Sequence, residues 1–469
     1  LGTSSVDEPR AWISEYVSNS CVTPADDVAH VTHVLGVDAD AREESPGVVT
    51  DQFRRACRKV ADIHERFPDL EDAPAEFTLL RSCAGVCKVT HLLRSVGPDI
   101  AEDALSEFDG TVAAALRRIL ACDLPASSLL QAGLPTCQGG VGLSPAVEMA
   151  TAAFVAARVE SRPMVRFLLE GLAEVAGDLT ALLAEYSDTL QAAQSDLFSR
   201  VGDARRATVD DAIAQAAAEA AERFSAVRSG RRAPSTTVDA EAEATLVHPA
   251  AAEDPEADAQ SRLQGSLSRV LGESQLEVLD AALRADADWP GLRRVRELRH
   301  PYTDHSWMNC LLAAHGPVLA ADRYVDSMRL RLGVPFIPDG IACPLCGEAL
   351  DRCGIHSQSC AQADATRGHY RVCHRVHLLA SLGDPEAAPE PLGLIPSRPS
   401  LRPADILTSA ATGSLAALDI GVCSPEAAGA GLDCCAAMHR RKKQTYAPYE
   451  AELRHGGVRY QPRVWSSWG

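Results

Sequence analysis

Four metal-ligating side chains lie close together in the last third of the chain, at Cys343, Cys346, His356 and Cys360. Two cysteines at this spacing can hold one side of a tetrahedral ion from a tight knuckle. A His and a Cys four residues apart can supply the other side from one helical turn. Four such ligands leave no coordination position open, so the spacing predicts a structural zinc site. Two alternatives are that Cys353, in the same loop, replaces His356 or another ligand, and that these residues are ordinary buried thiols.

Two aspartates, Asp405 and Asp419, lie in short apolar runs bounded by turn residues. The runs, at 401–407 and 415–422, predict a β-hairpin. With the turn centred midway between the runs, Asp405 falls opposite Leu418 or Asp419, and directly opposed side chains have Cβ atoms about 5 Å apart. Two carboxylates held in this way repel each other unless a cation lies between them, and Mg²⁺ with retained waters suits such a pair.

A helix with the basic run 439–443 is expected after the hairpin. A Lys near the metal could orient or deprotonate the attacking water, or neutralise charge on a phosphate. The combination predicts a metal-assisted phosphodiester hydrolase in which Asp405 and Asp419 hold the ion. Lys442 or Lys443 would then assist the nucleophile. The alternative is that the aspartates are turn or cap residues and the basic run is a solvated helix face.

The rest of the chain is expected to be mainly helical, because it is Ala-rich and only 5% of all residues are aromatic. Apolar residues recur at helical spacing over 53–64, 77–96 and 101–121. The glycine-rich segment 138–142 predicts a tight loop with close backbone approach. It does not predict a phosphate cradle, because no Gly-Lys-Ser/Thr follows it.

Length and charge limit the function classes. The 469 residues, 46% of them hydrophobic, suffice for two or three packed domains. The net charge of −19 does not suit a general nucleic-acid binder. From Pro335 to the end, however, basic and acidic residues balance at 13 each. Nucleic-acid contact by the earlier part must come from local patches, such as the arginines between 293 and 299, which could equally form a solvated helix face.

The cysteine count and the ends of the chain give further expectations. The 15 cysteines do not form the even framework of a secreted scaffold, so we expect mostly reduced thiols. There is no signal peptide and no apolar run long enough to span a bilayer, so we expect a soluble intracellular protein without membrane partners. Because the first residue is Leu1, we expect a fragment.

The order of these motifs resembles the C-terminal region of non-LTR (LINE-type) retrotransposon polyproteins that carry a restriction-like endonuclease of the PD-(D/E)-x-K type. The resemblance is carried by LRLGVP at 330–335, CPLCG at 343–347, the His-x3-Cys at 356–360, RPAD at 402–405 and ALDIGV at 417–422. Segments 79–94 and 134–143 are similar to parts that follow the polymerase palm. The resemblance therefore spans most of the chain from residue 51 onward.

The resemblance implies a nuclease that nicks target DNA, so that the free 3′ end primes reverse transcription. It implies that Asp405 and Asp419 are the acidic pair and that the catalytic Lys lies on the following helix, where Lys442 and Lys443 both fit. Tyr446 matches a Tyr that follows that Lys. The resemblance also implies DNA as the partner, with RNA of the parent element as a second partner, and residence in the nucleus.

Basic residues near the knuckle and the hairpin are expected to bind nucleic acid. Arg367 and His369 match a basic segment that follows the knuckle in the family, and Arg402 precedes the first acid. The chain departs from the family pattern in three ways: Ala404 separates Pro403 from Asp405, Gly421 occupies the third position after the second acid, and Gly368 separates Arg367 from His369.

We therefore expect a mainly α fold with a thumb-like helical region, followed by a small zinc knuckle and an α/β restriction-endonuclease-like domain. The expected parts are a poorly defined segment (1–50), the thumb-like region (51–227), an acidic flexible linker (228–259), a helical connector (260–334), the zinc knuckle (335–365) and the endonuclease (366–469). No aromatic-x-Asp-Asp motif marks a polymerase palm, so we expect no polymerase activity. Two other hypotheses are a zinc-knuckle nucleic-acid-binding module with a decayed nuclease, and a helical scaffold.

Overall fold

The computed structural model describes the chain in separate stretches. These are residues 31–34, 37–40, 46–98, 102–176, 180–229, 262–301, 303, 305–309, 319–360, 364–411, 413–427 and 433–468. The expected N-terminal segment up to residue 30 and the linker from 230 to 259 lie outside the described residues. The chain folds into two compact units. Unit 1 comprises Leu1–Glu71, Glu76–Leu116 and Leu143–Gln275, and unit 2 comprises Asp72–Ala75, Arg117–Gly142 and Leu276–Gly469.

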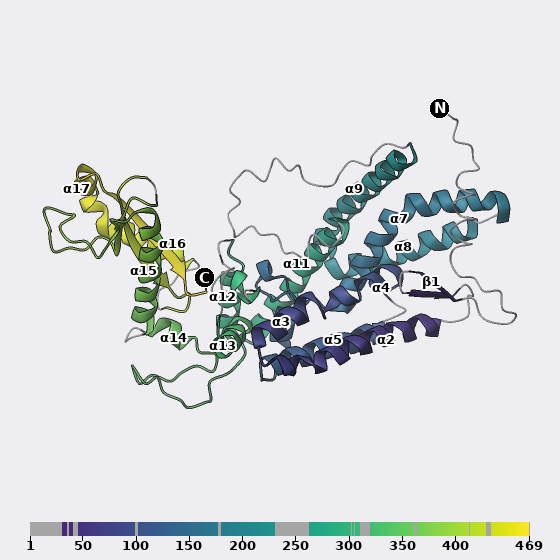
Figure 1. Cartoon of the computed structure of the whole chain (residues 1–469), viewed down its shortest axis with the longest axis horizontal. Helices are drawn as coiled ribbons and strands as arrows, with labels where there is room; N and C mark the ends of the chain where they lie inside the picture. Colours follow the sequence, from purple (N-terminus) through teal and green to yellow (C-terminus); the bar gives the residue numbers. More distant parts are fainter. Residues whose placement is uncertain are drawn as a thin grey trace. The chain divides into compact units, whose positions relative to one another are not determined.

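Unit 1 is predominantly helical, as its apolar periodicity predicts. Its elements are β1 (Val31–Val34), β2 (Val37–Asp40), α2 (Pro46–Glu65), η1 (Phe67–Leu70), α3 (Ala73–Ser82), η2 (Val86–Lys88), α4 (Thr90–Ser95), α5 (Glu102–Ile119), α7 (Ala146–Ala176), α8 (Thr180–Val201), α9 (Asp203–Arg228) and most of α11 (Arg262–Ala285). The long helices α7, α8 and α9 (Figure 1) share a hydrophobic core with α11, in which Leu197 and Leu267 are fully buried.

The single helix predicted over residues 77–96 is wrong. The segment forms α3, η2 and α4 instead. The break lies at Gly85, where a Cβ atom would come within 2.8 Å of the Leu80 carbonyl oxygen, so the chain turns where only glycine fits. The helix predicted over 101–121 is confirmed as α5. No helix among the described residues is long and apolar enough to cross a membrane.

Unit 2 contains shorter helices and a small sheet. Its elements are α6 (Ala126–Gly133), η3 (Thr136–Gln138), α12 (Trp289–Leu298), η6 (Ser306–Asn309), α13 (Ala321–Leu332), α14 (His356–Ser359), α15 (Asp364–Gly383), β3 (Ala388–Pro389), β4 (Ile406–Thr408), β5 (Ala416–Cys423), α16 (Cys434–Tyr446), η8 (Ala447–Tyr449), α17 (Glu450–His455) and β6 (Arg459–Ser466). The chain is thus mostly helical, with a four-stranded mixed sheet in its C-terminal part.

The glycine-rich loop after α6 closes around the side chain of Arg331. The guanidinium is buried and donates to the carbonyl oxygens of Gly140 (3.0 and 2.8 Å) and Thr136 (3.1 Å). A Cβ atom at Gly140 would lie 2.6 Å from the Gln131 carbonyl oxygen. The predicted close backbone approach is confirmed, and the loop binds an arginine through its carbonyl groups.

The arginines between 293 and 299 are partly built into unit 2. Arg293 forms an ion pair with Glu426, with nitrogen and oxygen 2.5 Å apart. Arg294 is only 5% exposed and donates to Gln131 Oε1 at 3.1 Å. A patch that has one member paired and another buried offers less positive charge to a nucleic acid than its sequence suggests.

The four strands lie in the order β3-β4-β5-β6. The first three pair antiparallel, and β6 pairs parallel to β5, so α16, η8 and α17 form the crossover between them. The predicted hairpin is confirmed as β4 and β5, in which Ile406 pairs with Leu418.

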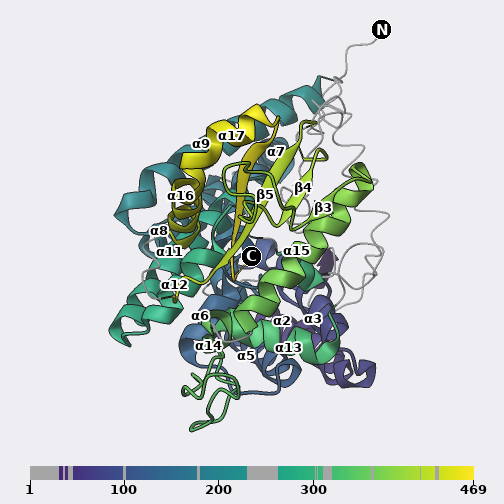
Figure 2. The same ribbon diagram turned by 90° about the vertical axis from the view of Figure 1, so that its left-hand side faces the viewer.

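Helices cover both faces of this sheet (Figure 2). On one face α15 packs against Ile406, Leu418 and Ile420. On the other face α16, η8 and α17 pack against Ala417 and Tyr460. Because successive residues of a strand point to opposite faces, Asp419 and Gly421 lie on the face that α16 covers.

Candidate functional site

The four ligands predicted for zinc come together in the structure. The Sγ atoms of Cys343 and Cys360 lie 3.8 Å apart, and Cys346 Sγ lies 3.2 Å from Nε2 of His356. One ligand atom from each residue lies within 4.8 Å of the other three. Zinc–sulfur bonds of about 2.3 Å in a tetrahedral site place sulfur atoms about 3.8 Å apart. The four residues could therefore hold a metal ion such as zinc.

A tight turn and one helical turn position these ligands. Gly347 adopts a φ of +79°, and its N–H donates to the Cys343 carbonyl oxygen at 2.9 Å, which closes the knuckle. The Asp351 carboxylate accepts the N–H groups of Ile355 (2.9 Å) and His356 (2.6 Å) at the start of α14. The helical turn predicted from the His-x3-Cys spacing is therefore confirmed.

Backbone N–H groups in the knuckle stabilise a thiolate. Those of Cys346 and Leu345 lower the pKa of the Cys343 thiol to about 6. The thiolate is the form that binds zinc. Cys353, the alternative ligand, lies outside the cluster, and its Sγ donates to the Gly333 carbonyl oxygen at 3.5 Å.

Replacing Cys353 by serine should leave the zinc content of the chain unchanged, because its thiol faces a carbonyl group. The matched replacement Cys346→Ser should lower the zinc content by one equivalent, because a serine hydroxyl is a poor zinc ligand. Zinc released from each denatured variant, measured with a chromogenic chelator, compares the two. A lower zinc content in Cys353→Ser would mean that Cys353 is a ligand.

The two aspartates predicted to share a metal ion lie close together in the hairpin, Asp419 within β5 and Asp405 directly before β4. The last printed pair of the two strands is Ile406 with Leu418, and the next residue of each strand is one of the aspartates. The backbone N–H of Asp405 donates to the Leu418 carbonyl oxygen at 2.9 Å, and Asp405 Oδ2 accepts the Ile420 N–H at 2.6 Å. The β5 backbone therefore holds the Asp405 carboxylate close to Asp419.

Lys442 is the lysine that reaches Asp419. Its Nζ donates to Asp419 Oδ1 at 2.5 Å and to the Ile420 carbonyl oxygen at 2.8 Å. The Tyr460 hydroxyl, from β6, donates to Asp419 Oδ2 at 2.5 Å. Burial, and then the hydrogen bond to Asp419, raise the pKa of Tyr460, which keeps the hydroxyl protonated. The Asp419 carboxylate therefore forms an ion pair with the Lys442 ammonium through one oxygen and accepts a hydrogen bond from Tyr460 through the other.

Gly421 makes room for the lysine. A Cβ atom at this position would lie 2.9 Å from Cε of Lys442 and 2.8 Å from Sδ of Met438. Both side chains come from α16, so this helix lies against β5 at a residue without a side chain. The absence of a side chain at Gly421 therefore leaves the space through which Lys442 reaches Asp419.

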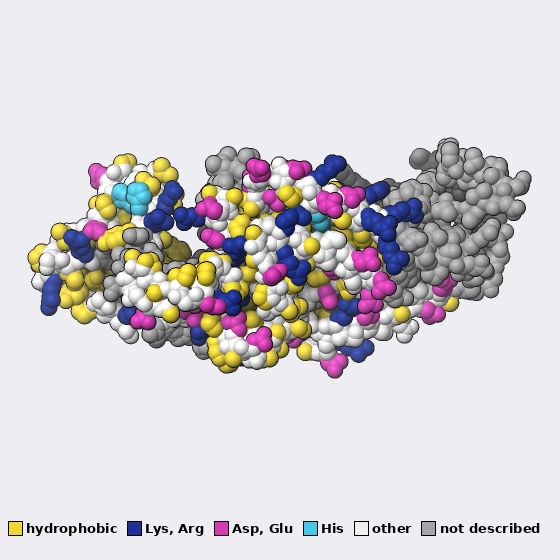
Figure 3. Space-filling view, turned by 90° about the horizontal axis from the view of Figure 1, so that it is seen from below, with side chains coloured by type: hydrophobic (Ala, Val, Ile, Leu, Met, Phe, Trp, Pro, Cys, Tyr) yellow, Lys and Arg dark blue, Asp and Glu magenta, His cyan; other side chains and the backbone are white. Residues whose placement is uncertain are grey.

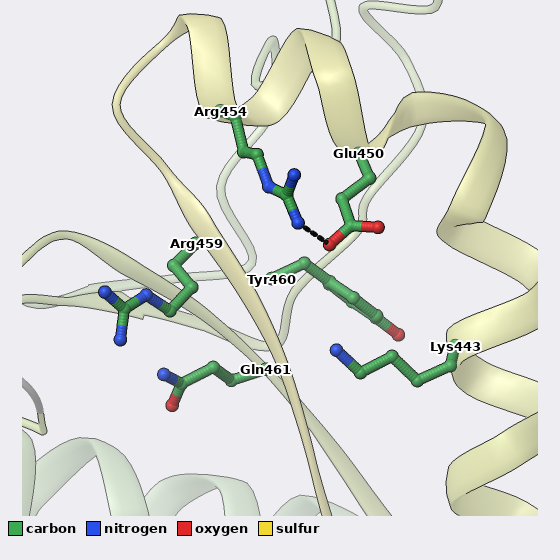
Figure 4. A pocket seen from close by; sticks show the side chains of 6 residues that line it. All are labelled: Lys443, Glu450, Arg454, Arg459, Tyr460 and Gln461. Carbon is green, nitrogen blue, oxygen red and sulfur yellow. Dashed lines mark hydrogen bonds and ion pairs between the residues drawn. The ribbon is translucent and has the colours of Figure 1, made fainter.

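Lys443 extends toward an open pocket beside Tyr460 (Figure 4). The pocket is lined by Lys443, Glu450, Arg454, Arg459, Tyr460 and Gln461. The Lys443 Nζ atom lies 5.9 Å from the centre of the Tyr460 ring, whose hydroxyl reaches Asp419. The lining contains three cationic side chains, those of Lys443, Arg454 and Arg459, and one acid, Glu450. Glu450 forms an ion pair with Arg454 at 2.7 Å. The pocket therefore carries net positive charge and adjoins the acidic pair.

Tyr446 has a packing position in the structure. Its ring lies 4.9 Å from that of Tyr460, between ring centres, and its hydroxyl donates to the Arg402 carbonyl oxygen at 2.9 Å. The Arg402 guanidinium forms an ion pair with Glu390 at the surface. Tyr446 thus holds the segment before Asp405 against α16.

His369, expected to bind nucleic acid, lies at the acidic pair. Its Nε2 is 3.4 Å from Asp405 Oδ1 and 3.4 Å from Cys373 Sγ, and these three residues form a further group that could hold a metal ion. The burial of Cys373, and next the charge of Asp405, raise the pKa of its thiol to about 12. Arg367 belongs to the same helix, α15, but its side chain lies outside the described residues.

A second cysteine cluster, which the spacing did not predict, lies where β5 ends and α16 begins. Cys423 Sγ is 3.4 Å from Cys434 Sγ and 3.6 Å from Cys435 Sγ. These three residues could also hold a metal such as zinc. Tyr460 was missed as well. The adjacent pair Cys434-Cys435 was a signal in the sequence, whereas Tyr460 reaches Asp419 only through the parallel pairing of β5 and β6.

Comparison with known proteins does not assign the chain to a family. No protein-family model matches it, and no curated protein does. On the described part of the face shown in Figure 3, Lys and Arg side chains are interspersed with Asp and Glu, so positive charge gathers only locally. Among the described residues, the features that bear on function are three groups that could hold a metal ion and the acidic pair with Lys442.

Proposed function

We propose that the C-terminal part of this chain is a metal-dependent DNA endonuclease that nicks target DNA, with Zn²⁺ as a structural ion and Mg²⁺ as the catalytic one. The observation that carries the proposal is that Asp405 is hydrogen-bonded to the β5 backbone on both sides of Asp419, while Lys442 from α16 contacts the Asp419 carboxylate. The resemblance to non-LTR retrotransposon polyproteins supports it, because it implies an acidic pair and a helical lysine at these positions. The sheet with α15 on one face and α16 on the other supports a restriction-endonuclease-like fold for residues 366–469.

The donor atoms suit Mg²⁺, which prefers oxygen ligands. They are the carboxylates of Asp405 and Asp419 and the carbonyl oxygen of Ile420, and the Lys442 ammonium already contacts two of these groups. A carboxylate oxygen has more than one lone pair, so it can bind a cation and keep its hydrogen bond. Asp405 and Asp419 would hold the ion, which supplies charge stabilisation at the phosphate and a more acidic water.

The remaining side chains would position the reacting groups. Lys442 would orient the attacking water or neutralise charge that develops on the phosphate, for which an ammonium at the acidic pair is well placed. Tyr460 holds Asp419 through Oδ2 and so fixes the orientation of the carboxylate. The cationic pocket with Lys443 would contact neighbouring phosphates, and such contacts position a duplex without reading its sequence.

The knuckle would hold Zn²⁺ as a closed site with three cysteines and one histidine. It is tied to the end of the sheet, because Ser467 Oγ, directly after β6, donates to Gln358 Oε1 in α14 at 2.7 Å. The resemblance implies that the knuckle helps to place the DNA. In the same proposal the nick supplies a 3′ end that primes reverse transcription by a parent element in the nucleus. Residues 51–227 would form a thumb-like region.

Nicking of supercoiled plasmid by the full chain tests the proposal. The chain is purified with its zinc and assayed with and without Mg²⁺, beside Asp405→Asn/Asp419→Asn prepared in the same way. Nicking that requires Mg²⁺ and is lost in the double variant is the expected result. DNA binding without nicking would instead indicate a zinc-knuckle nucleic-acid-binding module with an inactive nuclease. Equal nicking by both proteins would contradict the assignment of the acidic pair.

Replacing Gly421 by alanine should lower the nicking rate by roughly 10- to 100-fold, because displacement of a reacting group by about 1 Å can cost 100-fold. The added methyl group would collide with Lys442 Cε and Met438 Sδ. Gly171→Ala is a suitable control, because that helical glycine has no neighbour within 4 Å of the added atom. Single-turnover nicking rates compare the variants, and an unchanged rate in Gly421→Ala would show that Lys442 needs no such clearance.

A further inference from the structure

Cys423, Cys434 and Cys435 have the separations of metal ligands rather than those of a disulfide. The two measured Sγ–Sγ distances are 3.4 and 3.6 Å, and all three sulfur atoms lie within 4.8 Å of one another. Sulfur atoms around a tetrahedral zinc ion are about 3.8 Å apart, whereas those of a disulfide are about 2.05 Å apart. Three thiols at this spacing need only a small adjustment to bind one ion.

The backbone fixes the positions of these thiols. Cys423 is the last residue of β5, and its carbonyl oxygen accepts the N–H of Ser467 at 2.7 Å. Asp433 caps α16 by accepting the N–H of Ala436 at 2.7 Å, which sets the direction of the first helical turn. Because a strand end and a capped helix start carry the ligands, little conformational freedom is lost when an ion binds.

Acidic residues lie near the cluster. Asp433 directly precedes Cys434 at the start of α16, and the carboxylates of Asp433 and Glu297 are close enough to act electrostatically on Cys435. Two of the three cysteines, Cys423 and Cys434, are buried. A cation bound by the three sulfur atoms would be stabilised by these neighbouring carboxylates.

We propose that Cys423, Cys434 and Cys435 form a second zinc site, separate from the knuckle, which fastens the start of α16 to the end of β5. Three thiolates would bind the ion, and the fourth position would remain for a water. The proposal concerns metal binding and does not depend on the nuclease function.

The site would position the lysine that reaches the acidic pair. Cys435 precedes Lys442 by seven residues on α16, which is about 10 Å along the helix axis. The same strand, β5, carries both Cys423 and Asp419. An ion that joins the two elements at one end would limit their relative movement at the other.

Zinc content of the full chain tests the proposal. The protein is purified under reducing conditions, dialysed against metal-free buffer and analysed by mass spectrometry of the metal. Wild type should hold two zinc equivalents per chain, and Cys423→Ser/Cys434→Ser one. Cys57→Ser is the control, because the buried Cys57 thiol donates to the Ala104 carbonyl oxygen and belongs to neither cysteine cluster. This variant should keep both zinc ions. One equivalent in wild type, or two in the double variant, would overturn the proposal.

A second measurement, which leaves Cys423, Cys434 and Cys435 in place, covers the case in which Cys423→Ser/Cys434→Ser does not fold. Wild-type protein produced with Co²⁺ in place of Zn²⁺ should show near-ultraviolet thiolate-to-cobalt absorption from six cysteines per chain, three in each cluster. If Cys343→Ser/Cys346→Ser loses the knuckle ion, its absorption should come from the three cysteines of the second cluster and be about half as strong. Absorption that disappears entirely in this variant would mean that the knuckle is the only thiolate site and would contradict the proposal. Faster hydrogen exchange at the start of α16 in Cys423→Ser/Cys434→Ser is the expected structural consequence.

Discussion

Replacing Lys442 by methionine should lower the rate of Mg²⁺-dependent nicking by roughly 100- to 1,000-fold, the usual effect of removing a group that stabilises developing charge. DNA affinity should change little, because the ammonium is turned inward to Asp419 and the Ile420 carbonyl oxygen. Nicking under single-turnover conditions at saturating DNA measures the chemical step. Fluorescence anisotropy with a labelled duplex measures binding separately.

Lys443→Met is the matched control, since it makes the same chemical change at the next position of the same helix. Its ammonium lies beside the Tyr460 ring and lines the cationic pocket. We expect weaker DNA binding, a salt dependence of log K that is less steep by about 1, and a nicking rate at saturation close to that of wild type. If Lys443→Met abolished nicking and Lys442→Met only weakened binding, the two roles would have to be exchanged.

The parts of the site that the sequence predicted are those set by local geometry. All four knuckle ligands lie within one short segment, and their spacing corresponds to a turn and one helical turn, both of which the structure contains. The closeness of Asp405 to the β5 residues around Asp419 follows from a hairpin, in which the position of the turn determines which residues face each other. Neither prediction needed information about distant parts of the chain.

The choice between Lys442 and Lys443 could not be made in this way. Neighbouring residues of a helix point about 100° apart, so one residue of rotation decides which lysine faces the sheet. That rotation is set by the packing of α16 on β5, where Gly421 admits Lys442. Tyr460 depends on the parallel pairing of β5 with β6, a contact between segments that a helical crossover separates.

The second cysteine cluster and the buried arginine show a similar limit. Cys423 and Cys434 meet only because α16 folds back along β5. Arg294 belongs to a sequence patch that looks exposed, yet Gln131, far away in the chain, binds its guanidinium. In both cases the residue types showed what these side chains could bind, a metal ion or a negatively charged group. Only the tertiary structure shows whether they meet a partner inside the fold or face solvent.

Loss of the knuckle ion should unfold the knuckle while the sheet stays folded. Among the described residues of 341–360, the buried side chains belong to two of the ligands, Cys343 and Cys360, whereas the apolar side chains of Ile341 and Leu345 are exposed. A segment with so little apolar core depends on its ion, and structural zinc contributes about 10–16 kcal/mol of apparent binding free energy in comparable small domains. The β4–β5 hairpin instead has the α15-facing core around Ile406 and needs no zinc from the knuckle.

Hydrogen exchange of the full-length Cys343→Ser/Cys346→Ser variant measures this difference. Amides of residues 341–360 should exchange at the earliest time point, whereas those of β5 should stay as protected as in wild type. Cys353→Ser, whose thiol lies outside the ligand cluster, is the control and should keep its protection. Because Ser467 ties α14 to the end of β6, a modest rise in exchange at that end is also expected. Protection of residues 341–360 that survives loss of two ligands would mean that side-chain packing, and not an ion, holds the knuckle.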